Sequence, residues 1–211
     1  LVSDGSGEDR ALLRRAGQLL NEAGYPIRNG KRVGANGEKL TIEFLLEEPS
    51  FQPHHMPYIK NLQMLGIDAT LRMVDPVQYR SRIDDFDFDL AVQRFSFSTT
   101  PGDSLRAFFS SQAATICGSN NLAGMSDPAI DTLIEAIIAA PNRPALVTAC
   151  RALDRVIRSG RYWVPHWNKA SHWIAYWDLF ARPVQAKPRY SRGIPETWWF
   201  DDRAAKPERK G

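Results

Sequence analysis

The sequence has no long apolar run and few cysteines, and each shortage narrows the class of protein. No stretch approaches the roughly 18 consecutive apolar residues that a membrane helix requires. The first residues have neither the charged start nor the apolar core of a signal peptide. Because the chain begins with Leu1 and not with methionine, we expect a mature product or a piece of a longer chain. Cys117 and Cys150 allow one disulfide at most and match no metal-ligand spacing.

The composition is that of a folded globular chain. Of the 211 residues, 43% are hydrophobic and 24% are charged, which is enough apolar material for a packed core. This length predicts one domain or a tightly joined pair. The net charge of +3 comes from basic residues scattered along the sequence, so we expect no nucleic-acid partner.

Motifs for catalysis, metals or cofactors are missing or incomplete. Gly30 and Lys31 suggest a phosphate-binding loop, but the required glycine five residues before Gly30 is Tyr25 and the residue after Lys31 is Arg32. The four histidines lack the spacing of a helical zinc pair, and no G-x-S-x-G nucleophile turn is present. We therefore expect no catalytic residue, no metal site and no cofactor.

The first half of the chain alternates between helix and strand patterns. Apolar residues recur at helical spacing or at every second position, and glycines or prolines mark the ends. Strands joined by helical crossovers predict a mostly parallel sheet flanked by helices, an α/β fold. The expected helices are 8–23, 57–65 and 76–83, and the expected strands are 40–46, 67–74 and 88–92.

The second half changes character. Asp127 and Pro128 are a helix N-cap and first position, and Pro144 opens another helix that Gly160 closes. All six tryptophans follow, and residues 162–180 show an extended pattern without helical period. Residues 204–211 are charged and contain proline, which predicts disorder.

A polar loop after the third strand is the best candidate binding site. Open α/β sheets place ligands at the carboxyl ends of their strands, and residues 93–102 leave that end rich in hydroxyl groups, although an ordinary connecting loop is an equally good interpretation. Residues 118–124 form a second polar turn that can present side-chain amides. Together they predict ligand recognition without catalysis. The candidate ligand-binding residues are Arg94, Phe95, Ser96, Ser98, Thr99, Asn120 and Asn121.

Several alternatives stay open on the residues alone. Cys150 lies on the apolar face of its helix, so core packing is favoured over a disulfide with Cys117. Burial of the tryptophans in a core or against another domain is favoured over sugar-stacking platforms. Besides a binding lobe, the chain is compatible with a small α/β enzyme that uses the loop at 94–100, or with a carbohydrate-binding module that uses the tryptophans.

Ordered motifs along nearly the whole chain resemble a known family. They are similar to the C-terminal lobe of family 5 extracellular solute-binding proteins, the peptide- and nickel-type receptors of ABC importers. The sequences of residues 86–89 and 98–102 look most like those of the oligopeptide and microcin C subfamily. The motifs that carry the resemblance are Leu19-Leu20-Asn21-Glu22-Ala23-Gly24-Tyr25, Asn61-Leu62-Gln63-Met64-Leu65-Gly66-Ile67, Gly118-Ser119-Asn120-Asn121, Asp127-Pro128-Ala129-Ile130-Asp131 and Arg151-Ala152-Leu153-Asp154-Arg155-Val156.

The resemblance implies a periplasmic-binding-protein type II lobe and a periplasmic location. It also implies a peptide or peptide-like solute bound between two lobes, and delivery to an ABC permease in the inner membrane. On this view 1–160 is the binding lobe, 161–203 returns toward an N-terminal lobe that this chain lacks, and 204–211 is a tail. One lobe alone is then expected to bind ligand weakly and to expose aromatic surface.

One departure from the family bears on the ligand. Dipeptide and oligopeptide receptors of this kind carry an aspartate after the third strand that holds the ligand's amino terminus, whereas an ungapped alignment puts Phe97 there, beside Ser98. Arg94 instead favours a carboxylate or phosphate, since a guanidinium forms paired charge-assisted hydrogen bonds with such groups.

Overall fold

A three-stranded parallel sheet organises the first half of the chain. The computed structural model describes residues 4–97, 100–168, 173–182 and 197–201, and the chain divides into two compact units, Leu1–Val164 and Pro165–Gly211. In the first unit the strand order is β4-β3-β5, and both pairings are parallel, as the sequence predicts. The strands are β3 (Thr41–Leu46), β4 (Asp68–Met73) and β5 (Leu90–Ala91).

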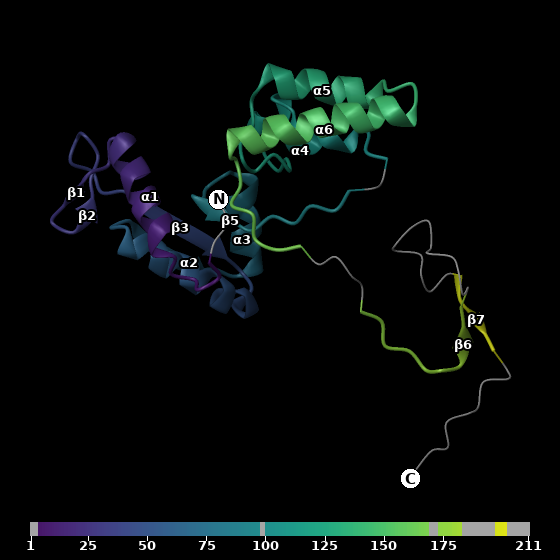
Figure 1. The fold of residues 1–211 in the computed structure, drawn as a ribbon, viewed down its shortest axis with the longest axis horizontal. Coiled ribbons are helices and arrows are strands. Elements are labelled where there is room, and N and C mark those ends of the chain that lie inside the picture. The colour runs from purple at the N-terminus through teal and green to yellow at the C-terminus, as the bar shows by residue number, and fades with distance from the viewer. Residues whose placement is uncertain (1–3, 98–99, 169–172, 183–196, 202–211) are drawn as a thin grey trace, which may run out of the picture. The chain divides into compact units, whose positions relative to one another are not determined.

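Helices cover both faces of this sheet (Figure 1). Phe44 of the central strand packs with Ile59 and Leu62 of one helix on one face. Leu45, the next residue, packs with Ile83 of another helix on the opposite face, because successive strand residues point to opposite sides. The helices are α1 (Arg10–Glu22), α2 (Gln52–Met64) and α3 (Pro76–Asp84), with a 3-10 turn at Pro49–Phe51. The α/β fold class is confirmed.

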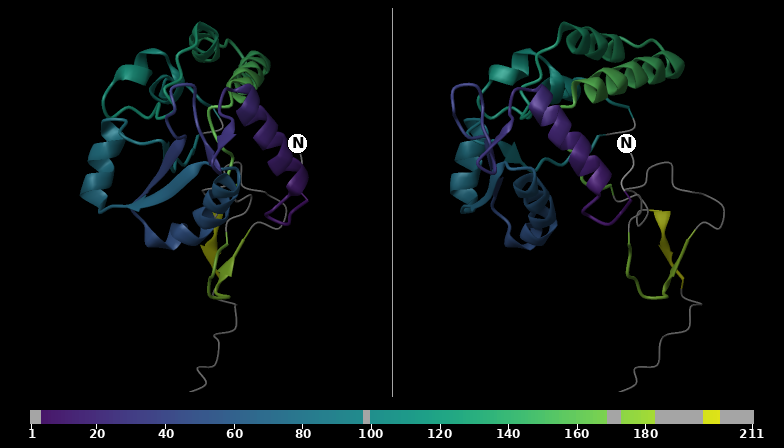
Figure 2. Two further views of the ribbon diagram at one scale, coloured as in Figure 1. Left: turned by 90° about the vertical axis from the view of Figure 1, so that its left-hand side faces the viewer. Right: turned by 60° about the vertical axis from the view of Figure 1, so that its left-hand side comes forward.

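A helical layer completes the first unit. Figures 1 and 2 show α5 (Pro128–Ile138) and α6 (Arg143–Gly160) side by side, with α4 (Ser104–Phe109) against them. Asp127 caps α5 as predicted, and Asn142 caps α6 by accepting a hydrogen bond from the Ala145 amide. Their apolar faces form the largest buried cluster of this unit: Leu105, Phe109, Met125, Ile130, Ile134, Ile137, Leu146, Leu153 and Ile157.

The start of α2 differs from the sequence expectation. A proline at position 57 predicts the first turn, but α2 begins at Gln52 and Pro57 lies inside it. The buried side chain of His55 stabilises the additional helical turn before Pro57. Its Nδ1 lies 2.7 Å from the Phe51 carbonyl oxygen, and its ring packs edge-on against Phe44. Tertiary contacts therefore outweigh the local cost of the proline.

A short hairpin joins α1 to the sheet. The sequence predicts only a turn at this place. The hairpin contains β1 (Ile27–Arg28) and β2 (Lys31–Arg32), paired antiparallel. Its last residue, Arg32, is 3% exposed. Its guanidinium donates hydrogen bonds to the Leu65 and Tyr25 carbonyls at 2.8 and 2.9 Å, and to Asn21 Oδ1 at 2.5 Å. These bonds connect the ends of α1 and α2 to the hairpin.

The second unit is small. Its described residues pair β6 (Phe180–Ala181) with β7 (Trp199–Phe200) antiparallel, and Trp198 contacts Tyr176 with ring centroids 4.6 Å apart. The described residues between 162 and 180 form no helix, as expected. The tail predicted at 204–211 lies outside the described residues. No helix in the described part of the chain is long and apolar enough to span a membrane.

Candidate functional site

The carboxyl ends of the three parallel strands bring charged and aromatic side chains to one edge of the sheet. Glu47 and Glu48 follow β3 directly, and Gln93 and Arg94 follow β5. Phe51, in the turn before α2, lies beside them. This edge is where open parallel sheets place their ligands.

Arg94 brings a positive charge to this edge of the sheet. Its side chain is 74% exposed, with Nη2 3.9 Å from Glu48 Oε2 and the guanidinium carbon 5.1 Å from the centre of the Phe51 ring. An exposed ion pair of this length contributes at most about 1 kcal/mol, so Glu48 orients the guanidinium without neutralising it. The ring beneath it holds one face and leaves the donors along its edge for an anionic group.

Tyr79 and Glu47 are site neighbours that the sequence analysis did not name. Burial raises the pKa of the half-buried Tyr79 hydroxyl, the Glu47 carboxylate raises it further, and a hydrogen bond with the Val92 backbone opposes both effects. The hydroxyl therefore stays protonated at neutral pH. Glu47 and Glu48 follow a strand just as Arg94 does, so the same strand-end rule applied to β3 identifies them.

An aromatic cluster anchors the loop that carries Arg94. Phe95 and Phe97, two residues apart, stack with ring centroids 6.0 Å apart. Phe95 also lies 4.7 Å from Trp163, and Phe97 lies 5.2 Å from Phe108 of α4. Phe109 contacts Phe95, Phe97 and Trp163. Both phenylalanines remain partly exposed, so the cluster is an apolar wall as well as an anchor.

The two asparagines of the second polar turn have different environments. Asn120 is exposed, and its carbonyl accepts a hydrogen bond of 3.0 Å from Gln93 Nε2, which ties this turn to the strand-end loop. Asn121 is fully buried; its amide donates to the Ser110 and Met125 carbonyls and accepts from the Met125 amide. With its side chain occupied in this way, Asn121 stabilises the turn and does not face a ligand.

The structure describes only some of the hydroxyl residues in the loop after β5. Ser96 is exposed next to Arg94. Ser98 and Thr99 lie outside the described residues. Thr100 accepts a hydrogen bond of 3.4 Å from Arg143 of α6, which links the end of the loop to the helical layer.

Comparison with known proteins identifies the family. The family "Bacterial extracellular solute-binding proteins, family 5 Middle" matches residues 3–115. This chain belongs to that family. The "Probable peptide-binding protein YejA" of Agrobacterium fabrum is 41% identical over 199 residues, 94% of this chain and 32% of that protein. The "Peptidoglycan-binding protein YepA" of the same organism is 34% identical over 94% of this chain and 32% of its own length.

Solved structures agree on the fold. The oligopeptide-binding protein AppA from Bacillus subtilis, in complex with a nonapeptide, matches with a TM-score of 0.62 and 19% identity over 71% of this chain and 30% of its own. At that identity the match concerns the fold alone. This family 5 chain spans about a third of the length of the curated relatives it matches.

This family 5 chain has neither a metal-binding cluster nor a disulfide among its described residues. Within the described residues, no group of three or more His, Cys, Asp or Glu side chains is placed to hold a metal. Both cysteines are free, so the alternative of a Cys117–Cys150 disulfide is wrong. Cys117 is exposed, with Sγ 3.8 Å from Asp85 Oδ1, whereas Cys150 packs against the α4–α6 core, as the favoured interpretation has it.

Proposed function

We propose that the chain is a ligand-binding lobe of the solute-binding component of an ABC-type importer. The receptor takes a peptide or peptide-like solute between two lobes in the periplasm and delivers it to a permease in the inner membrane. Membership of family 5 supports this function, as does the similarity to the probable peptide-binding protein YejA of Agrobacterium fabrum. Binding and release require no bond making, so we infer that the lobe is not an enzyme.

The observation that carries the proposal is the placement of Arg94 at the strand ends, between Glu48 and Phe51. The guanidinium binds the carboxylate end of the solute through paired hydrogen bonds. Ser96, Ser98, Thr99 and Asn120 offer hydroxyl and amide groups to the peptide backbone. Phe95 and Phe97 receive apolar side chains of the solute.

Two glutamates on this edge replace the aspartate that other peptide receptors carry after the third strand. Glu47 and Glu48 are both exposed and follow the neighbouring strand. Glu47 follows β3 and Arg94 follows the neighbouring β5, so an ammonium group at Glu47 and a carboxylate at Arg94 are bound on the same edge of the sheet. A short zwitterionic peptide satisfies both charges.

The test maps peptide contacts on the chain itself. Amide NMR spectra are recorded during titration with a short unblocked peptide, at concentrations high enough to detect the weak binding expected of one lobe. The proposal predicts shifts at residues 47–51 and 93–97 that are lost in Arg94→Gln. Arg14→Gln, which removes an exposed arginine from α1, is the control and retains them. Shifts confined to other surfaces, or unchanged in Arg94→Gln, would contradict the proposal.

A further inference from the structure

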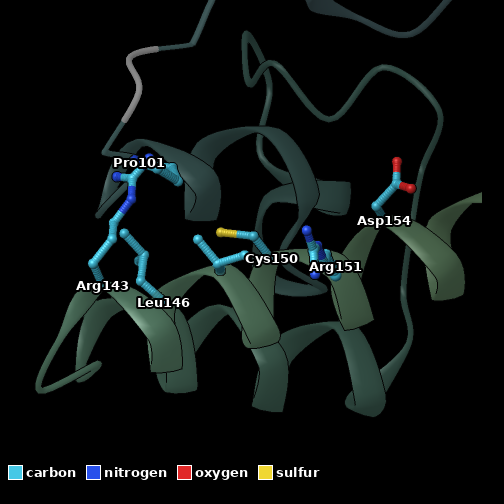
Figure 3. Close-up of a pocket in the computed structure, with 7 residues that line it drawn as sticks. Pro101, Arg143, Leu146, Cys150, Arg151 and Asp154 are labelled. Atoms are coloured by element: carbon cyan, nitrogen blue, oxygen red, sulfur yellow. The ribbon is translucent and has the colours of Figure 1, made fainter.

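A groove runs along α6, apart from the strand-end site (Figure 3). It has a volume of about 360 Å³, and Pro101 forms the wall opposite the helix. A second hollow of about 350 Å³ shares Pro101, Arg143 and Leu146 and continues it toward the end of α5. The residues that line the groove are Pro101, Arg143, Leu146, Val147, Cys150, Arg151 and Asp154.

The lining residues recur at helical spacing, so they form one stripe of α6. Leu146, Val147 and Cys150 make an apolar floor, and Arg143 and Arg151 bracket it. Eight residues separate the two arginines, which is about two helical turns, or about 12 Å along the axis.

The helix that carries this stripe has a net positive charge. Residues 143–161 carry five arginines and one aspartate, a net charge of +4, more than the +3 of the whole chain. Asp154, the acidic residue that lines the groove, is engaged by Arg158 at 3.0 Å. Arg151 makes no ion pair with any described residue. Five of the 27 basic residues of the chain thus lie on α6 or directly after it.

We propose that this groove binds an extended segment of a partner protein that carries acidic side chains four residues apart, with an apolar side chain midway between them. In an extended chain, positions i, i+2 and i+4 point to the same side, and four residues span about 13 Å. That span matches the separation of Arg143 and Arg151. The two carboxylates pair with the arginines, and the central side chain lies on the apolar floor.

Cys150 supplies a reporter for occupancy. Cys150 lines the floor of the groove, and burial raises the pKa of its thiol, while the positive charge of Arg143 opposes that effect. A segment on the floor covers the thiol. Its alkylation should therefore slow when the groove is filled.

The probe is the blocked pentapeptide acetyl-Glu-Val-Leu-Val-Glu-amide with a fluorescent label, titrated into the full chain by anisotropy at low salt. A second measurement follows the alkylation rate of Cys150 in a Cys117→Ser chain. We expect saturable binding and slower alkylation. Charge reversal of both arginines, Arg143→Glu with Arg151→Glu, should weaken binding by about tenfold or more, because it replaces two attractive ion pairs with repulsion.

Matched controls separate this site from general electrostatic attraction. Arg155→Glu makes the same charge change as Arg151→Glu alone, but on α6 outside the groove, and should leave binding unchanged, as should Arg94→Gln at the strand-end site. A probe with lysine at both ends should bind the doubly reversed variant better than the original chain. This rescue distinguishes a specific pairing from a variant that has merely unfolded.

Four outcomes would overturn the proposal, and two of them would assign the groove to another occupant. Equal binding of a probe with glutamine at both ends would show that the arginines are not used. Loss of binding in Arg155→Glu equal to that in Arg151→Glu would show a diffuse charge effect. Binding to phosphatidylglycerol vesicles without protection of Cys150 by the probe would assign the surface to lipid. Self-association abolished by Arg151→Glu, without probe binding, would assign it to a second copy of the chain.

Discussion

At the scale of single residues, Arg32 shows how a buried charge is held without a carboxylate. Its acceptors are carbonyl and amide oxygens near the ends of α1 and α2, where helix dipoles place partial negative charge. Hydrogen bonds to charged groups are the strong ones in proteins, and each acceptor left unpaired in a buried site adds its own cost.

Arg32→Met should therefore lower the free energy of unfolding by about 3 kcal/mol, since it removes the hydrogen bonds while keeping most of the apolar stem. Urea denaturation followed by circular dichroism measures the change. Arg28→Met, at an exposed position of the same hairpin, is the control and should change it by less than about 0.5 kcal/mol. Equal effects of the two substitutions would show that the hydrogen bonds of Arg32 contribute nothing.

The adjacent asparagines make a second residue-scale prediction. Asn121→Ala leaves the Met125 amide and the Ser110 and Met125 carbonyls without their partner and should destabilise the fold by about 2–3 kcal/mol. Asn120→Ala removes an exposed side chain and should leave the denaturation midpoint almost unchanged. If Asn120→Ala were the more destabilising, the roles assigned to the pair would be reversed.

At the scale of elements, an ion-pair network joins α4 to α5. Arg106 pairs with Glu135 at 2.6 Å and also with Asp103. The hydrogen bond from Arg106 lowers the pKa of Glu135 below its ordinary value of 4.5, and the positive charge of Arg106 adds to this effect. A lowered pKa in the folded state means that the pair stabilises the fold above about pH 4.5 and that this stabilisation is lost as the pH falls through the folded-state pKa.

Glu135→Gln should thus reduce the thermal stability at about pH 7 and have little effect at about pH 3, where the wild-type carboxyl is already protonated. Melting curves at the two pH values measure the difference. Glu38→Gln, on an exposed turn, is the control. An equal loss of stability at both pH values would show that Glu135 acts through packing and not through its charge.

Element types follow from local sequence far better than element boundaries. Apolar periodicity and capping residues such as Asp127 predict α1, α5, α6 and the parallel sheet, because these signals lie within each segment. The early start of α2 depends on His55 packing against Phe44, and the hairpin at 27–32 is held by Arg32, so both need contacts from distant residues. In the candidate site, the strand-end rule finds Arg94, whereas the structural role of Asn121 depends on partners that only the fold brings together.

At the scale of the whole molecule, the tryptophans are largely exposed within this chain. Trp173 is 86% exposed, Trp177 71% and Trp167 58%. Burial in the core of this chain, one of the two favoured interpretations, is therefore wrong for these three. The other interpretation, burial against another domain, fits a chain that spans about a third of its curated relatives.

Exposed aromatic area of this kind should make the chain associate with itself as its concentration rises, since monomers rarely leave large apolar patches uncovered. Sedimentation velocity over a range of concentrations measures the association. Trp173→Ser with Trp177→Ser should reduce it, and the same substitutions should blue-shift the tryptophan emission by removing the most solvent-exposed indoles. A monomer at all concentrations, with emission unchanged in the variant, would show that these side chains are covered.

The proposed function rests on the strand-end edge, where Arg94 binds the carboxylate of a peptide. Isothermal titration calorimetry of one unblocked tripeptide, compared with the same tripeptide as its C-terminal amide, tests it most directly. We expect this single lobe to bind the free acid with weaker than micromolar affinity, and the amide about tenfold more weakly because it lacks the charge-assisted hydrogen bonds. Equal affinity for the acid and the amide would contradict the role of Arg94, and submicromolar binding by a monomer would contradict the interpretation of the chain as one wall of a cleft.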